Sequence, residues 1–232
     1  MTFQRPKTQD MKTVFIPCRA VVAPGPISEA ILKGVKEKSV CLVTTAQFVH
    51  MLDEVKKTLE DPRLKTEDRK QVTVNLGRPN PGQVLGCDAR AACGGKAECV
   101  VYIGTGRFHA LRAAVEADKP VYMVRPTGEV EKVSKRDVMA FQKKRYARLS
   151  KLEDAGTVGI VVSTKPGQEK MKDALQIQSK LRKQGKKAFI FAANEIKPQN
   201  LDGFKVDAWV STACPRIAED RFEKPVVDSY EL

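Results

Sequence analysis

The chain has 232 residues, of which 42% are hydrophobic and 30% are charged, and its formal net charge is +13. This balance excludes an intrinsically disordered chain, and the length favours one large domain or two small ones. No apolar run approaches the roughly 18 residues that cross a bilayer, and the first ten residues are too polar for a secretory signal, so we expect a cytoplasmic protein without a membrane anchor.

The first 37 residues are expected to be an N-terminal remnant and linker, because they fit neither of the two α/β sets that follow. Residues 12–16 have the apolar pattern of a strand. A loop rich in proline and glycine is expected over residues 23–26.

From residue 38 onward, short apolar runs alternate with amphipathic stretches. The apolar runs predict strands over residues 39–44, 71–76, 98–103 and 120–124. Helical spacing of apolar residues predicts helices over residues 47–60, 88–97, 107–117 and 134–155. Between them, proline and glycine predict a loop over residues 77–86.

The same alternation returns after residue 153. Strands are predicted over residues 157–163, 187–192, 207–211 and 225–227, and helical segments over residues 168–184, 198–201 and 215–219. Continuous apolar strands that alternate with helices are typical of parallel sheets covered on both faces. The sequence therefore predicts two three-layer α/β sandwich domains with mainly parallel sheets, divided as residues 1–37, 38–153 and 154–232.

Polar loops follow four of the predicted strands, at residues 44–47, 104–109, 163–168 and 211–216. Ligands of open parallel sheets bind beyond the carboxyl ends of the strands, where helix N-termini attract anions. Each loop alone also fits an ordinary tight turn, and Gly104 and Gly106 lack the third glycine of a dinucleotide fingerprint. Together, the loops predict one shared ligand site.

Six cysteines occupy positions 18, 41, 87, 93, 99 and 214. Cytoplasmic proteins rarely keep disulfides, so these are buried thiols, metal ligands or reactive groups. Cys18, Cys41 and Cys99 lie in or beside apolar runs and are expected to be core thiols. Cys87 and Cys214 lie where turns begin and could converge with a third ligand, although paired zinc-type spacings are absent.

Five segments resemble the archaeal diphthamide-synthesis radical enzymes, a family of 3-amino-3-carboxypropyl transferases. Residues 100–109 closely resemble the family's FIGSGRFH segment, residues 159–168 its GI-V-TKPGQ segment, and residues 210–217 its TACPRI segment. Two shorter runs, residues 42–47 and 83–88, are similar to LVTT-Q and QILGCD. All five occur in the family's order between residues 38 and 232.

The resemblance implies three similar α/β domains, each giving one cysteine thiolate to a [4Fe-4S] cluster that leaves one iron open for S-adenosylmethionine. In the family, a 3-amino-3-carboxypropyl radical adds to a histidine of elongation factor 2, and a further protein donates the electron. Cys87 and Cys214 would be the cluster ligands of the second and third domains. The residues implied to bind S-adenosylmethionine are Gly104, Thr105, Gly106, Arg107, His109, Thr164, Lys165, Gly167, Gln168, Thr212 and Arg216.

The chain departs from this pattern at its N-terminal end. Only residues 12–19 resemble the family's first domain, and they match its last strand, so one cluster ligand is unaccounted for. A partner chain brings the missing domain, or Cys93, Cys99 or the second copy of a homodimer supplies the ligand. Alternatively, the chain is a non-catalytic subunit of a split or heteromeric synthase. A basic protein that binds RNA or the ribosome is the remaining alternative, because the positive charge favours an acidic partner.

Overall fold

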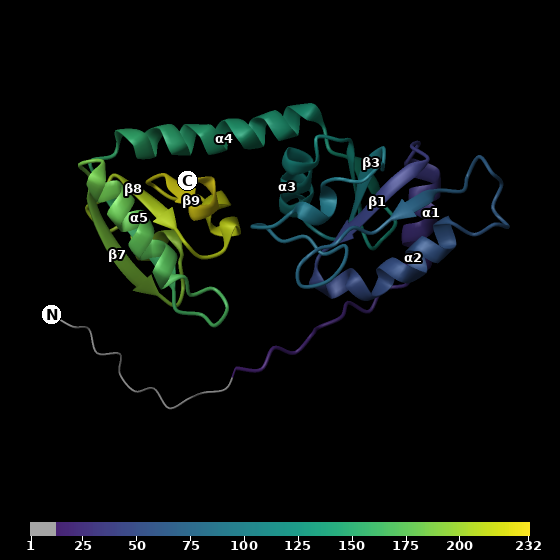
Figure 1. Ribbon diagram of the computed structural model, residues 1–232, viewed down its shortest axis with the longest axis horizontal. Helices are drawn as coiled ribbons and strands as arrows, with labels where there is room; N and C mark the ends of the chain where they lie inside the picture. The colour runs from purple at the N-terminus through teal and green to yellow at the C-terminus, as the bar shows by residue number, and fades with distance from the viewer. Residues whose placement is uncertain (1–12) are drawn as a thin grey trace.

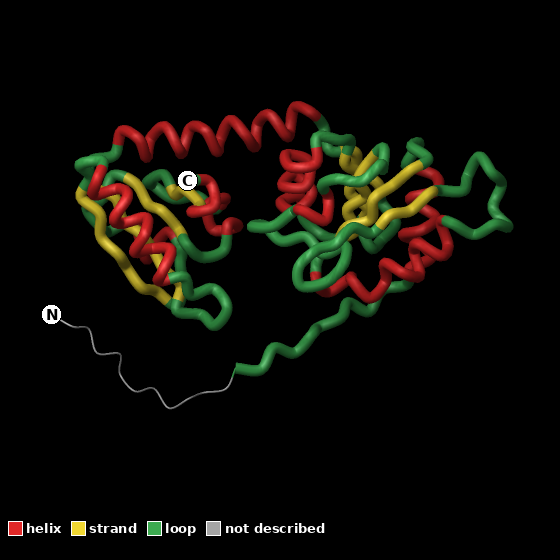
Figure 2. Tube along the Cα trace, viewed as in Figure 1, coloured by secondary structure: helices red, strands yellow, loops and turns green. Residues whose placement is uncertain are grey.

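The computed structural model describes residues 13–232, and two separate sheets organise them. Helix α4 (Lys135–Asp154) runs from one sheet unit to the other along one side of the molecule (Figure 1). Helices lie on the faces of both sheets (Figure 2). The predicted pair of three-layer α/β sandwiches with mainly parallel sheets is confirmed. No helix among residues 13–232 combines the length and the apolar content that a membrane span requires.

The first half of the molecule contains a five-stranded sheet. Its strands, in spatial order, are β2 (Gln71–Thr73), β1 (Ser39–Thr44), β3 (Cys99–Ile103), β4 (Val121–Val124) and β5 (Val130–Lys132). The first four strands are parallel, and β5 pairs antiparallel with β4. The sequence prediction missed β5, because this short polar edge strand has no apolar run.

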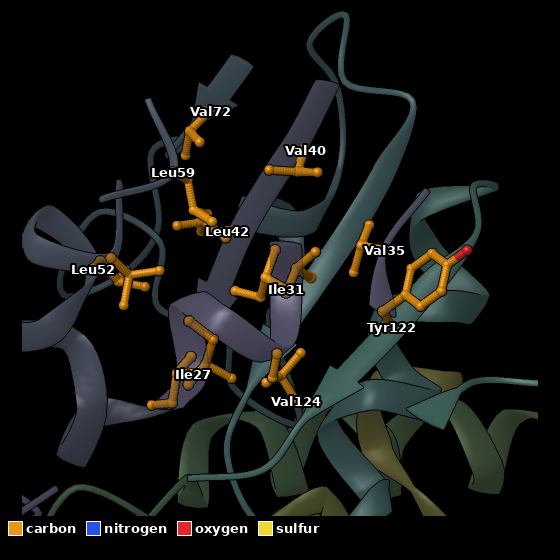
Figure 3. Packing of buried hydrophobic residues seen from close by; sticks show 14 of the residues in the cluster. Ile27, Ile31, Val35, Val40, Leu42, Leu52, Leu59, Val72, Tyr122 and Val124 are labelled. Atoms are coloured by element: carbon orange, nitrogen blue, oxygen red, sulfur yellow. The ribbon is translucent and has the colours of Figure 1, made fainter. Parts of the chain in front are cut away.

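Helices cover both faces of this sheet, and each face has its own apolar core. Helices α1 (Pro24–Gly34) and α2 (Leu52–Leu59) pack on one face, and α3 (Arg107–Ala117) packs on the other. Figure 3 shows side chains from α1, β1 and α2 pointing toward one another in the first of these cores. Removal of this apolar surface from water is the main force that holds the layers together.

The N-terminal segment differs from the sequence prediction. The loop expected over residues 23–26 is wrong from Pro24, where α1 begins, because proline fits the first helical turn, whose N–H groups lack helical partners. Ile27 and Ile31 of this helix are fully buried against the first sheet. The strand expected over residues 12–16 is also absent: Lys12 lies outside the described residues, and residues 13–16 are exposed without strand pairing. The division at residue 37 stays a prediction.

The second half contains a four-stranded parallel sheet. Its strands, in spatial order, are β7 (Lys187–Ala193), β6 (Thr157–Ser163), β8 (Ala208–Ser211) and β9 (Val226–Asp228). Helix α5 (Met171–Lys183) and the end of α4 cover one face. The other face packs against α6 (Pro198–Leu201) and the 3₁₀ turn η3 (Pro215–Glu219).

Most other differences are shifts of element ends. The helix predicted over residues 47–60 consists of the 3₁₀ segment η1 (Ala46–Met51) followed by α2. The segment over residues 88–97 contains only a 3₁₀ turn, η2 (Arg90–Ala92). The last turn of the chain is η4 (Ser229–Glu231). The strongly apolar runs therefore predicted the strands correctly. The weak Ala-rich stretch over residues 88–97 did not form an α-helix.

Gly159 of β6 lies directly against the ring of Trp209 on β8, and Trp209 is 1% exposed. A methyl group at Gly159 would overlap the indole ring, so we expect Gly159→Ala to lower the free energy of unfolding by about 1–3 kcal/mol. The control is Gly203→Ala, since no other group lies within 4 Å of a Cβ at that position. Urea-unfolding midpoints measure the difference, and equal midpoints for the two variants would contradict this packing.

Ser134 caps the N-terminus of α4, because its Oγ accepts a hydrogen bond from the backbone N–H of Asp137 at 3.1 Å. Replacement of such a cap by alanine typically costs about 1 kcal/mol, so Ser134→Ala should lower the unfolding midpoint measurably. Ser150→Ala, on the exposed side of the same helix, is the matched control and should leave the midpoint nearly unchanged.

Candidate functional site

Loops that follow strands of the two sheets meet at a junction between the two halves. A Cβ built on Gly86 would lie 2.7 Å from the Phe108 ring and 3.7 Å from Cβ of Pro215. The guanidinium of Arg216 lies 6.0 Å from the centre of the same ring. The segment before Cys87, the start of α3 and the turn after Cys214 are therefore in contact, as the carboxyl ends of parallel strands permit.

A cavity of about 270 Å³ opens at this junction. It lies where α3 and α4 of the first half approach η3 of the second. Its walls are formed by Gly106, Arg107, Phe108, Leu111, Phe141, Arg216 and Glu219. Three of the predicted site residues, Gly106, Arg107 and Arg216, thus share one cavity.

The loop after β3 brings Gly104 close to a buried tyrosine. A side chain at Gly104 would collide with the hydroxyl of Tyr102, 2.6 Å from a built Cβ, and the φ of +158° also favours glycine. His109 stacks on Tyr102 with ring centroids 6.2 Å apart. Burial lowers the pKa of His109, so its imidazole is neutral at neutral pH. Thr105 is exposed on the same loop.

The predicted arginines of the site are already paired with carboxylates. Arg107 lies 3.1 Å from Glu131 of β5 and 2.8 Å from Asp137 of α4. Arg216 lies 2.9 Å from Asp220 and is half exposed. These pairs hold the two guanidinium groups at the cavity wall, where exposure to solvent leaves each of them able to bind an anion as well.

The remaining predicted residues divide into exposed and buried groups. Thr164, Lys165, Gly167 and Gln168 form an exposed turn after β6, in which the Lys165 N–H donates to Ser163 Oγ at 3.1 Å. Thr212, by contrast, is fully buried, and its Oγ1 donates to the carbonyl oxygen of Val161 at 3.3 Å. Thr212 therefore ties β8 to β6 instead of facing a ligand.

Cys87 and Cys214 are both partly exposed at the junction. Burial raises the pKa of the Cys87 thiol, and the ammonium of Lys170 from the second half opposes this effect. Asp228, also from the second half, acts on the same thiol in the opposite direction to Lys170. Cys214 precedes η3, next to the Pro215 that faces Gly86. One thiol from each half therefore lies at the junction, and thiolates are the protein ligands that iron–sulfur clusters take.

The other four thiols lie in different settings. Cys41 and Cys99 are buried, which confirms them as core thiols, whereas Cys18 is exposed, so its expected burial is wrong. The Cys93 thiol donates to the carbonyl oxygens of Ala89 and Glu116 at 3.6 and 3.4 Å. Within residues 13–232, no three His, Cys, Asp or Glu side chains form a group that could hold a metal ion.

Two charged residues that the sequence analysis did not select lie at the same junction. Asp228 ends β9, and Arg112 lies on α3; both are buried. Burial and the nearby Glu231 raise the pKa of Asp228 to about 7, and Arg112 partly opposes this rise. Asp228 comes directly after the strand predicted over residues 225–227, as the four polar loops come after theirs, so the sequence could have indicated it. The burial of Arg112 had no signal in the sequence.

The chain belongs to the family described as "Putative diphthamide synthesis protein", whose model matches residues 3–232. It is 33% identical to the 2-(3-amino-3-carboxypropyl)histidine synthase of Pyrococcus horikoshii, over 96% of this chain and 65% of that protein. It is 30% identical to subunit 1 of the Schizosaccharomyces pombe synthase, over 82% of this chain and 45% of that one.

A solved structure gives the same relationship. The crystal structure of Dph2 from Pyrococcus horikoshii with a 4Fe-4S cluster is similar with a TM-score of 0.78 and 32% identity, over 92% of this chain and 62% of that chain. The family and the fold that the sequence motifs indicated are thus confirmed. The chain spans about 65% or less of the length of these relatives.

The burial of the six thiols predicts their order of alkylation. Cys18 should react with iodoacetamide first, the partly exposed Cys87, Cys93 and Cys214 more slowly, and Cys41 and Cys99 only after unfolding. Burial raises the pKa of Cys99 to about 12, so this thiol stays protonated and unreactive at pH 8. Peptide mass spectrometry over time, with a urea-unfolded sample as control, measures the order. Rapid native labelling of Cys41 or Cys99 would contradict the fold.

Proposed function

We propose that this chain takes part in the transfer of the 3-amino-3-carboxypropyl group of S-adenosylmethionine to a histidine of elongation factor 2, in the cytoplasm. The observation that carries the proposal is the contact at Gly86, Phe108 and Pro215, which brings together two cysteine-bearing loops from different sheets. The names of two relatives support it, since both are 2-(3-amino-3-carboxypropyl)histidine synthases. A 4Fe-4S cluster in the Pyrococcus horikoshii structure supports the cofactor.

In this proposal, Cys87 and Cys214 would be two of the protein ligands of a [4Fe-4S] cluster. The bound cluster would supply the electron that cleaves a carbon–sulfur bond of S-adenosylmethionine. Lys170 stabilises the thiolate form of Cys87 electrostatically, against the effect of burial. The partial burial of both cysteines limits the access of water to the thiolates.

Three of the motif loops are proposed to bind S-adenosylmethionine. Gly106 leaves open space for the close approach of a ligand to the backbone after β3, and Gly104, packed against Tyr102, sets the path of the loop. Thr105 lies between them. The exposed turn after β6 offers Lys165 and the backbone around Gly167. The contributing residues of this proposal are Gly104, Thr105, Gly106, Arg107, His109, Thr164, Lys165, Gly167, Gln168 and Arg216, with Thr212 in a positioning role.

The third cluster ligand is proposed to come from outside the described residues. Cys93 is bonded to carbonyl oxygens on the α3 side of the first sheet, and Cys99 is fully buried. A partner chain that carries the part of the relatives not spanned by this chain would supply the cysteine, as would a second copy in a homodimer. A separate electron donor protein completes the set of partners.

A non-catalytic partner subunit is the second candidate. It is favoured by the junction itself, where two thiols but no third metal-binding side chain of residues 13–232 come together. A cluster held by only two protein thiolates is unusual. In this alternative the chain stabilises an active partner and binds no cluster.

Anaerobic reconstitution with iron and sulfide separates the two candidates. We expect the wild-type chain to become brown and to bind about four irons per cluster, and Cys87→Ala and Cys214→Ala each to lose most of this iron. Cys93→Ala and Cys18→Ala are the matched controls and should keep it. Iron and sulfide analysis and the electron paramagnetic resonance spectrum after dithionite are the measurements. A colourless wild type would exclude a cluster held by this chain alone or by its homodimer. Reconstitution together with a partner chain that carries the missing cysteine then separates a split enzyme, which would bind iron, from a non-catalytic partner subunit, which would not.

A further inference from the structure

Two oppositely charged side chains, each with one polar atom that lacks a hydrogen-bond partner, face the junction from different halves of the molecule. Asp228 is 2% exposed, and its Oδ2 has no hydrogen-bond partner. Arg112 is 7% exposed, and its Nε likewise has none. A buried charge that is left without its hydrogen bonds is unfavourable, so a pair of such groups indicates that something else completes them.

The charged groups around this pair have their nearest contacts elsewhere, and Arg145 Nε and Glu231 Oε2 also lack hydrogen-bond partners. Arg145 forms an ion pair with Glu231 at 3.1 Å, and the Lys170 ammonium lies 4.1 Å from the centre of the Tyr230 ring. Arg112 itself uses Nη2 to contact Glu116 at 3.3 Å. Asp228 uses only Oδ1, which accepts from the Tyr230 N–H at 3.2 Å. Arg112, Arg145 and Lys170 therefore act on Asp228 at a distance, and none of them bonds Oδ2.

The location of the pair connects it to the proposed cofactor site. Asp228 acts electrostatically on the Cys87 thiol. Arg112 lies one helical turn after Phe108, whose ring contacts the Gly86 segment. In Figure 1, α3 is the helix of the first half that faces the second half. Asp228 and Arg112 thus approach the junction from β9 and α3, on opposite sides.

We propose that Asp228 and Arg112 together bind the zwitterionic amino-acid head group of S-adenosylmethionine. Asp228 Oδ2 accepts a hydrogen bond from the α-ammonium, and Arg112 Nε donates one to the α-carboxylate. This assignment rests on the proposed function and names the subsite within it. An amino-acid head group carries one cation with N–H donors and one anion with acceptors, which are the two partners that the pair lacks. A sulfonium has no N–H to donate, so it does not satisfy Asp228 in the same way.

Three nucleosides separate this role from a general effect on folding. S-adenosylmethionine and S-adenosylhomocysteine both carry the head group, whereas methylthioadenosine lacks it. In calorimetric titrations of the full chain, we expect Asp228→Asn and Arg112→Gln each to weaken binding of the first two by about tenfold or more, because a charge-assisted hydrogen bond is lost. The affinity for methylthioadenosine should change by less than about twofold. Asp61→Asn, at a distant exposed turn, is the control and should change no affinity.

Each other outcome has a distinct meaning. If both variants weaken all three nucleosides equally and lower the urea-unfolding midpoint, Asp228 and Arg112 are a structural pair that joins the halves, and the subsite is overturned. Unchanged binding of S-adenosylmethionine by both variants overturns it as well. If the wild-type chain binds none of the three nucleosides, the proposed function fails together with the subsite. Asp228→Asn lies on β9 and Arg112→Gln on α3. If one of the two variants does not fold, the binding data of the other still test the proposal.

Discussion

In each sheet, the parallel strands place the loops that follow them at one edge, and the contact of Gly86 with Phe108 and Pro215 brings two such edges together. Everything proposed for this chain depends on that contact. Cys87 and Cys214 come from different sheets and lie far apart in sequence, so neither half alone offers more than one of them. The site is a property of how the two halves meet.

Helix α4 maintains this arrangement because it belongs to the packing of both halves. Near its start, Phe141 is buried, with its ring centroid 6.4 Å from that of Phe108 on α3. Near its end, Leu152 lies in the core of the second half. Between them, Arg148 pairs with Glu219 at 2.9 Å, which fixes the helix to the turn after Cys214. One continuous helix is therefore in contact with both halves.

Electrostatics differ between the surface and the junction. The chain carries a formal net charge of +13, and such a surplus on the surface favours an acidic partner. The junction contains charges of both signs. The carboxylates of Asp228 and Glu231 lie near the cationic groups of Arg112, Arg145 and Lys170. A ligand that carries charges of both signs is compatible with this environment, whereas a simple anion would leave Asp228 without a partner.

The sequence by itself determined the strands with strong apolar runs, the long helix with its serine cap, the family, and the two cysteines that lie where turns begin. These features depend on short stretches of sequence. For the strands and the helix, the spacing of apolar residues matches the alternation of buried and exposed positions in each element. Only the tertiary structure decided that α1 packs on the first sheet, that Cys18 is exposed, that Thr212 is turned inward, and that Asp228 and Arg112 are buried without partners. Burial of a polar side chain depends on contacts between segments that are distant in sequence, and no local pattern of residues encodes which segments will meet.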